Sequence, residues 1–70
     1  MPKKKITERR ALGKSLVVEM TAKRMEKRLS LRAVMPLIKA QYATIWRWEN
    51  GTSVPNAFHI HQLKKWLGYL

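Results

Sequence analysis

The chain has 70 residues and no cysteine, which favours one small domain and excludes a disulfide framework or a cysteine-based zinc site. Its 15 Lys and Arg oppose 4 Asp and Glu, and the net charge of +11 favours a polyanion as partner, because neutralised phosphates release condensed counterions. An anionic membrane surface is the other candidate, but no apolar run approaches the roughly 18–20 residues that span a bilayer.

The positive charge is concentrated in the N-terminal half, where residues 1–39 carry 12 Lys or Arg and 3 Glu. Three consecutive lysines near the start have no apolar residue to pack on, so we predict a flexible basic arm over residues 1–13. No apolar segment follows them as in a secretory signal, and we therefore expect a cytoplasmic protein. The arm is a solvated tail, a nuclear localisation signal or a segment that tracks DNA phosphates; the last role would use Lys3, Lys4 and Lys5.

The folded domain is expected over residues 14–70, and it begins with a helix from about Lys14 or Ser15 to near Arg28. Gly13 weakens any helix before that start, since glycine loses more backbone entropy than other residues. Apolar residues at helical spacing predict the inward face of this helix: Leu12, Leu16, Val17 and Met20.

A second helix is predicted after Ser30, because the serine hydroxyl can accept an otherwise unpaired backbone N–H at a helix start. Its apolar residues recur at helical spacing: Leu31, Val34, Met35 and Ile38. Pro36 lacks an N–H and its ring crowds the preceding turn, so we expect a kink or an early end with a 3₁₀ turn at Leu37–Ile38.

A turn at Lys39–Ala40 and a third helix from about Tyr42 to Glu49 are expected next. Its core residues are Ile45 and Trp48, Gln41 is a modest N-cap, and Asn50-Gly51 ends it because glycine readily adopts positive φ. A fourth helix is predicted from Asn56 to about Trp66, with Gly68 as terminator. Its expected inward residues are Phe58 or Ala57, Ile60, Leu63 and Leu67.

Several residues occur in an order that is characteristic of one family: Leu29-Ser30, Ala40, Thr44-Ile45, Arg47-Trp48-Glu49-Asn50-Gly51, Pro55, Leu63 and Leu67-Gly68. This order resembles the phage repressor/Cro-type helix-turn-helix family, also called the XRE family, over roughly residues 15–68. The resemblance implies an all-α, lambda repressor-like fold, a compact four- to five-helix bundle that binds operator DNA as a two-fold dimer. The lysine-rich start is also similar to the arm of lambda-type repressors.

The resemblance implies that the third helix is a recognition helix in the DNA major groove. Its DNA-facing residues would be Gln41, Tyr42, Ala43, Trp46 and Arg47. Gln41 can pair with adenine and Arg47 with guanine or a phosphate, while Ala43 and Trp46 can contact a thymine methyl. An alternative for Trp46 is a core or dimer role, because large aromatic side chains are mostly buried. Candidate phosphate contacts outside the arm are Lys39, Asn50 and Thr52.

The resemblance also implies a structural ion pair between Arg24 and Glu49, although an exposed Glu49 is the simpler alternative. Three residues depart from the family pattern. Leu31 replaces a glutamine that touches phosphate, Pro36 is atypical, and Lys39 replaces the turn glycine. The last change destabilises the turn by around 1 kcal/mol if positive φ is required.

We therefore expect a sequence-specific regulator that binds double-stranded DNA, is derived from a phage, a prophage or a mobile element, and is nucleoid-associated. A homodimer would use Trp66, Tyr69 and Leu70 near the C-terminus, unless Trp66 only completes the monomer core. Polymerase is an expected protein partner. The alternatives are an antitoxin-like or anti-repressor module whose partner is a toxin or repressor, and a basic peptide that binds RNA or a membrane surface.

Residues suited to catalysis or metal binding are sparse, so we expect no enzyme, no cofactor and no metal site. His59 and His61 are two residues apart on a predicted helix and therefore lie on different faces. The only carboxylates are those of Glu8, Glu19, Glu26 and Glu49, which gives no paired arrangement for acid/base catalysis.

Overall fold

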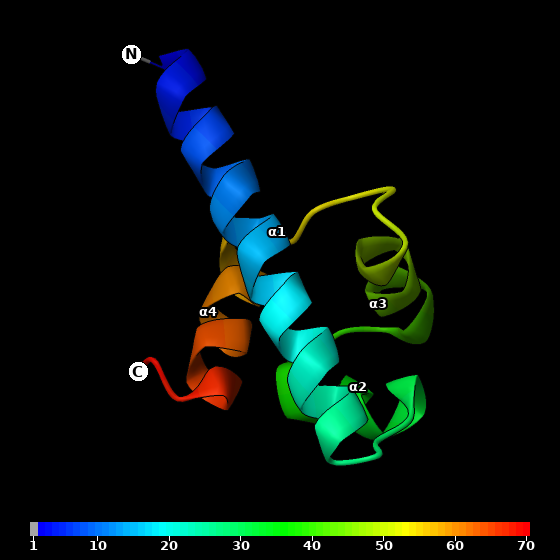
Figure 1. Cartoon of the computed structure of the whole chain (residues 1–70). Helices are drawn as coiled ribbons and strands as arrows, with labels where there is room; N and C mark the ends of the chain where they lie inside the picture. Colours follow the sequence, from blue (N-terminus) through cyan, green and yellow to red (C-terminus); the bar gives the residue numbers. More distant parts are fainter. Residues whose placement is uncertain (1) are drawn as a thin grey trace.

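A computed structural model describes the backbone of residues 2–70 and the side chains of residues 8–70. Over this range the secondary structure is entirely α-helical, and the four helices (Figure 1) are α1 (Pro2–Glu26), α2 (Leu31–Ile38), α3 (Tyr42–Glu49) and α4 (Ala57–Leu67). Helices α1 and α2 each pack against both α3 and α4, so the predicted all-α, compact fold is confirmed. None of these helices combines the length and the apolar character needed to cross a bilayer.

Helix α1 begins at Pro2, and the prediction that it starts near Lys14 is wrong. Proline suits the first helical position because its missing N–H has no intrahelical partner there, and most of the residues that follow are good helix formers. Gly13 lies within the helix and is buried, where a Cβ would lie 3.1 Å from Cδ of Pro55. Gly13 therefore allows α1 to approach the segment before α4 closely, and the expected boundary after residue 13 falls inside α1.

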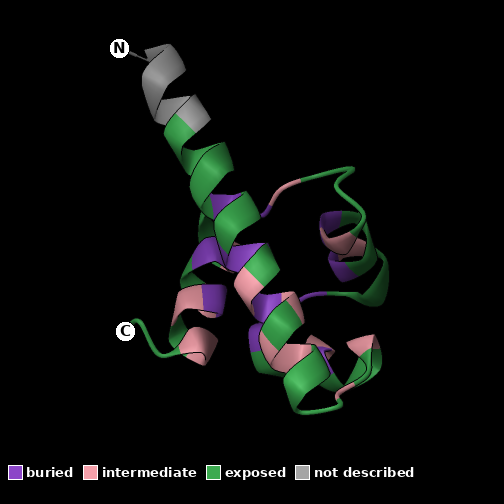
Figure 2. Ribbon diagram, in the orientation of Figure 1, coloured by how far each residue is buried: buried purple, intermediate pink, exposed green. Residues whose placement is uncertain are grey.

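The hydrophobic core lies where the four helices meet (Figure 2). Its side chains come from all four helices and from the turn after α2: Leu16, Val17, Met20, Val34, Ile38, Ala40, Ile45, Trp48, Ile60 and Leu63. Two predicted core residues are exposed instead. Leu12 is 39% exposed because α1 projects beyond the bundle there (Figure 1). Phe58 is 52% exposed and its alternative, Ala57, is exposed too, because Ile60 takes the inward position in the first turns of α4.

Helix α2 continues as an α-helix through Pro36 to Ile38, so the predicted early end and 3₁₀ turn are wrong. The proline removes one hydrogen bond to the carbonyl of Arg32, in the exposed first turn of a short helix. Val34 and Ile38 are both fully buried, and this burial offsets the lost bond by keeping the apolar face of α2 in the core.

Polar caps and left-handed residues end the helices as the sequence indicates. The hydroxyl oxygen of Ser30 accepts the Ala33 N–H at 3.1 Å, and Oδ1 of Asn56 accepts the His59 N–H at 3.0 Å. Gly51 follows α3 with φ of +76°, and Gly68 ends α4 with φ of +92°. The predicted bounds of α3 and the caps of α4 are therefore confirmed.

The turn between α2 and α3 contains a non-glycine residue in the left-handed region. Lys39 has φ of +52°, and its N–H and that of Ala40 both donate to the carbonyl of Met35. Positive φ is therefore required at the position where the family pattern has glycine. The hydrogen bonds and the buried Ala40 hold the turn in this conformation despite the steric strain at Lys39.

Replacing Lys39 tests this strain. We expect Lys39→Gly to be more stable than Lys39→Ala by about 1 kcal/mol in free energy of unfolding, because only glycine adopts positive φ without a Cβ clash. Both variants lose the lysine charge, so their difference reports the backbone alone. Urea denaturation of the two proteins measures it, and equal stabilities would show that the turn is not strained.

Candidate nucleic-acid interface

The outward face of α3 carries the side chains predicted for the recognition helix. Ile45 and Trp48 are buried, and the intervening positions leave the other side of the helix at the surface. The exposed residues are Gln41, Tyr42, Ala43, Trp46 and Arg47. Trp46 is 47% exposed, so the alternative that it belongs to the monomer core is wrong.

The Gln41 side chain is available for a ligand, since it makes no capping hydrogen bond although its backbone occupies the N-cap position of α3. Its amide offers one acceptor and two donors at an exposed position. Arg47 adds an exposed guanidinium two turns further along α3, with donors in a planar fork. This end-to-end arrangement gives α3 hydrogen-bonding groups near its start and in its last turn.

Arg32 is a candidate interface residue that the sequence reasoning missed. It is exposed in the first turn of α2, and its guanidinium carbon lies 6.0 Å from the centre of the Tyr42 ring on α3. The contact places a cation from α2 next to the aromatic residue that starts α3. The sequence offered only a basic residue two positions after the Ser30 cap as a signal. The closeness of Arg32 to Tyr42 depends on how α2 and α3 pack.

The two loop residues predicted to bind phosphate use donors within the chain. Nδ2 of Asn50 donates to the carbonyl of Trp46 at 2.8 Å, and the Thr52 hydroxyl donates to the carbonyl of Arg47 at 3.1 Å. Both side chains thus cap the C-terminal end of α3. Asn50 keeps a second amide hydrogen for a ligand, whereas a donated bond from Thr52 to phosphate would replace its bond to Arg47.

The remaining predicted phosphate contacts are lysines. Lys39 is exposed in the turn between α2 and α3, on the approach to the start of α3. The arm side chains of Lys3, Lys4 and Lys5 lie outside the residues whose side chains the structure describes.

The expected ion pair joins α1 to the end of α3. The Arg24 Nε and Nη2 atoms donate to the two carboxylate oxygens of Glu49, each at 2.9 Å, and the Arg24 Nη1 donates to the carbonyl of Leu29, also at 2.9 Å. The two side chains are only 17% and 13% exposed, so the alternative of a solvent-exposed Glu49 is wrong. A bidentate pair of this kind restrains direction as well as distance, and it orients the end of α3 relative to α1.

Two of the three C-terminal residues that were expected at a dimer interface, Trp66 and Tyr69, contact α1 of the same chain. The Lys23 Nζ donates to the carbonyl of Trp66 at 2.6 Å and lies 4.6 Å from the centre of its ring. Trp66 packs partly against the core, while Tyr69 and Leu70 are exposed. The Tyr69 hydroxyl donates to the Glu19 carboxylate, and this hydrogen bond raises the pKa of Tyr69 above its usual value.

His59 packs against neighbouring side chains of the bundle. The His59 ring lies 5.0 Å from the Trp48 ring in an edge-to-face arrangement, and its Nδ1 is 3.0 Å from Oδ1 of Asn56. Among the side chains that the structure describes, no three potential His, Cys, Asp or Glu ligands come together as a metal site.

No family model matches the chain, and neither a curated protein nor a solved structure matches it.

The Arg24–Glu49 pair can be tested with a double-mutant cycle. We expect Arg24→Gln and Glu49→Gln each to lower the free energy of unfolding by roughly 2–3 kcal/mol, because each leaves a partly buried charged or polar group without its partner. The double variant should lose clearly less than the sum of the two single losses. Glu8→Gln, which removes an exposed carboxylate from the same helix, is the control and should leave stability unchanged. Strictly additive losses would mean that the pair does not couple α1 to α3.

Proposed function

We propose that α2, the turn at Lys39–Ala40 and α3 form a helix-turn-helix that binds double-stranded DNA sequence-specifically. The observation that carries the proposal is the exposed face of α3, which combines hydrogen-bonding and apolar side chains and has no free acid. The one carboxylate on α3 belongs to Glu49, and it is paired with Arg24. The net charge of +11 supports the same partner, because DNA phosphates attract cations over a long range.

The dimensions of α3 suit the proposed binding mode. An α-helix with its side chains is about 10–12 Å in diameter, and the DNA major groove, about 12 Å wide, admits it. In this mode Gln41 pairs with adenine, Arg47 pairs with guanine or a phosphate, and Trp46 packs on a thymine methyl. Arg32 and Tyr42 flank the start of the helix and contact the phosphates beside it.

The proposed regulator acts as a dimer on an operator, as the resemblance to phage repressor/Cro-type proteins implies. Two recognition helices related by a two-fold axis lie about 34 Å apart and read an inverted repeat with half-sites one helical turn apart. Tyr69 and Leu70 are exposed and contribute the apolar part of the dimer contact, next to the partly buried Trp66. The dimer bound to its operator would then exclude or recruit RNA polymerase.

Selection from a random duplex library at about 150 mM salt tests the function, since purely electrostatic binding is weakened there. We expect an enriched inverted repeat. On the selected duplex, Arg47→Lys keeps the charge but loses the planar fork, and it should lower affinity at least about tenfold, or about 1.4 kcal/mol.

Trp46→Ala should relax the preference for thymine at one position of the selected site, because it removes the side chain that packs on the methyl group. Phe58→Ala is the matched control, as it removes an aromatic side chain of similar exposure from α4. Tight binding without any enriched sequence, or equal losses for Trp46→Ala and Phe58→Ala, would overturn the proposed recognition surface.

The lysines at the start of the chain are proposed to add to DNA affinity separately from α3, and the salt dependence of binding measures this addition. Deleting residues 2–5 removes three lysines, and the slope of log affinity against log salt should become shallower by about 0.9 for each lysine that contacts a phosphate. The selected sequence should stay the same, because phosphate contacts carry little base information. An unchanged slope would show that these lysines do not reach the DNA.

A further inference from the structure

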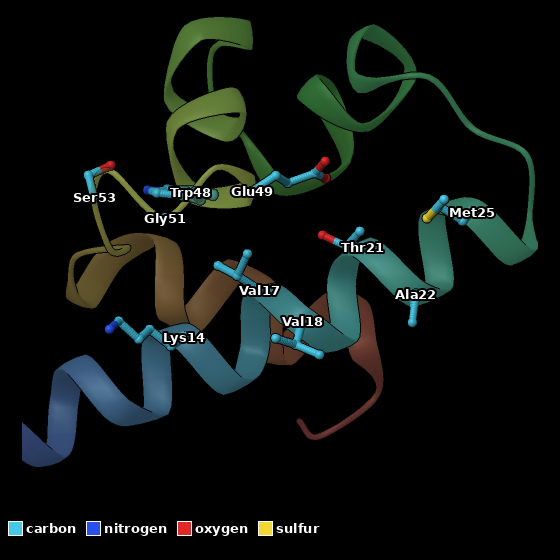
Figure 3. A pocket seen from close by; sticks show the side chains of 10 residues that line it. All are labelled: Lys14, Val17, Val18, Thr21, Ala22, Met25, Trp48, Glu49, Gly51 and Ser53. Carbon is cyan, nitrogen blue, oxygen red and sulfur yellow. The ribbon is translucent and has the colours of Figure 1, made fainter.

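A groove of about 600 Å³ lies between α1 and the C-terminal end of α3 with the loop that follows it. Its apolar lining comes from one side of α1, with Val17, Val18, Ala22 and Met25, and from Trp48 on α3. Lys14 lies at one end of the groove and Met25 at the other (Figure 3). The proposed DNA-binding side chains of α3 lie on its opposite, outward face and do not line the groove.

Three of the apolar residues that line the groove, Val18, Ala22 and Met25, are exposed, whereas Val17 and Trp48 belong to the core. Val18 is 68% exposed and Met25 is 65% exposed, although both lie on a helix whose other side fills the core. Helical spacing places the exposed and the buried apolar residues of α1 on different faces. Val18, Ala22 and Met25 follow one another at four and three residues, while Leu16 and Met20 face inward. Helix α1 thus has a second apolar face that the monomer does not bury, and faces of this kind mark interaction sites.

The dimensions of the groove fit a short helix. From Lys14 to Met25 the groove follows α1 for about 16 Å, which is the length of three helical turns. The wall formed by Trp48 and the loop after α3 makes the surface concave. An amphipathic helix fills such a groove with apolar side chains on one face, at positions i, i+3 or i+4, and i+7.

The charges around the groove select an acidic occupant. Lys14 lines it, and Arg10 lies one turn earlier on the same side of α1. Glu49 is the only acid among the lining residues, and its carboxylate is held by two hydrogen bonds from Arg24. Glu26 lies beyond the far end, one turn after Ala22, and does not line the groove.

The net charge of the chain also favours an acidic occupant of the groove. The proposed dimer contact lies at the C-terminus and its charge is neutralised by DNA phosphates, whereas a partner that enters the groove beside Lys14 and Arg10 is favoured when it is acidic and disfavoured when it is basic. A flat lipid surface does not enter a concave groove, whereas a helix does. We infer that this groove binds an acidic amphipathic helix, about three turns long, from another protein, and this inference is independent of the proposed DNA binding.

Two synthetic three-turn peptides test the inference with the full chain. Both carry leucines at i, i+3 and i+7; one has glutamates on its flanks and the other has lysines at the same positions. Fluorescence anisotropy at about 150 mM salt measures their affinities. We expect the glutamate peptide to bind at least about tenfold more tightly than the lysine peptide.

Variants of the chain locate the binding site. Val18→Lys should weaken the glutamate peptide at least about tenfold, whereas Leu37→Lys, at an exposed apolar position on α2 outside the groove, should leave its affinity unchanged. Lys14→Glu should weaken the glutamate peptide and strengthen the lysine peptide. Circular dichroism confirms that each variant keeps its helices.

Several outcomes would overturn the inference. Equal affinities of the two peptides, equal effects of Leu37→Lys and Val18→Lys, or no binding of either peptide would each do so. A chain that sediments as a dimer until Val18→Lys makes it a monomer would identify a second copy as the occupant. Binding to vesicles with anionic lipids that is lost in Val18→Lys would identify a membrane instead. A failure of the DNA selection would leave these peptide measurements unaffected, so the two proposals fail separately.

Discussion

The guanidinium of Arg24 fixes the relation between the two helices on which everything else in this structure depends. It holds Glu49 at the end of α3 through two hydrogen bonds and the carbonyl of Leu29, just before α2, through a third. One side chain on α1 therefore sets the position of α3 and of the segment leading into α2. The same pairing removes the only acid on α3 from competition with a bound anion, so a structural contact also determines the electrostatics of the exposed face.

Local chemistry explains why much of the structure could be predicted from the sequence. Some residues cap or end a helix through contacts within a few residues of the chain, so their roles can be predicted without knowing the fold. They are Ser30, Asn56, Gly51 and Gly68. The period of the apolar residues likewise places Ile45 inward and the five candidate DNA contacts outward. The Arg24–Glu49 pair is different, since only the family resemblance connected two residues so far apart in the sequence.

The sequence-based predictions that are wrong concern positions where tertiary packing outweighs the local conformational preference of a residue. Pro36 stays within α2 because Val34 and Ile38, two residues before and after it, are buried in the core, and Gly13 stays within α1 because Pro55 packs against it. Leu12 has the correct helical spacing but lies beyond the helices that would cover it. Arg32 reaches Tyr42 only because of the angle between α2 and α3, and the groove beside α1 exists only once α3 and its loop are placed.

The distribution of the few acids connects the two proposed surfaces. Glu49 is paired with Arg24 and Glu19 accepts a bond from Tyr69, so half of the four carboxylates are engaged in holding the bundle together. The basic residues outnumber them almost fourfold, and most must therefore face solvent without a counter-charge. In the proposed DNA complex, a field of this sign attracts phosphates to the exposed face of α3, where polar side chains would hydrogen-bond bases. At the proposed groove beside the apolar stripe of α1, the same field would favour carboxylates on a helix that buries Val18 and Met25, so under the two proposals one charge excess selects different partners according to the surface that carries it.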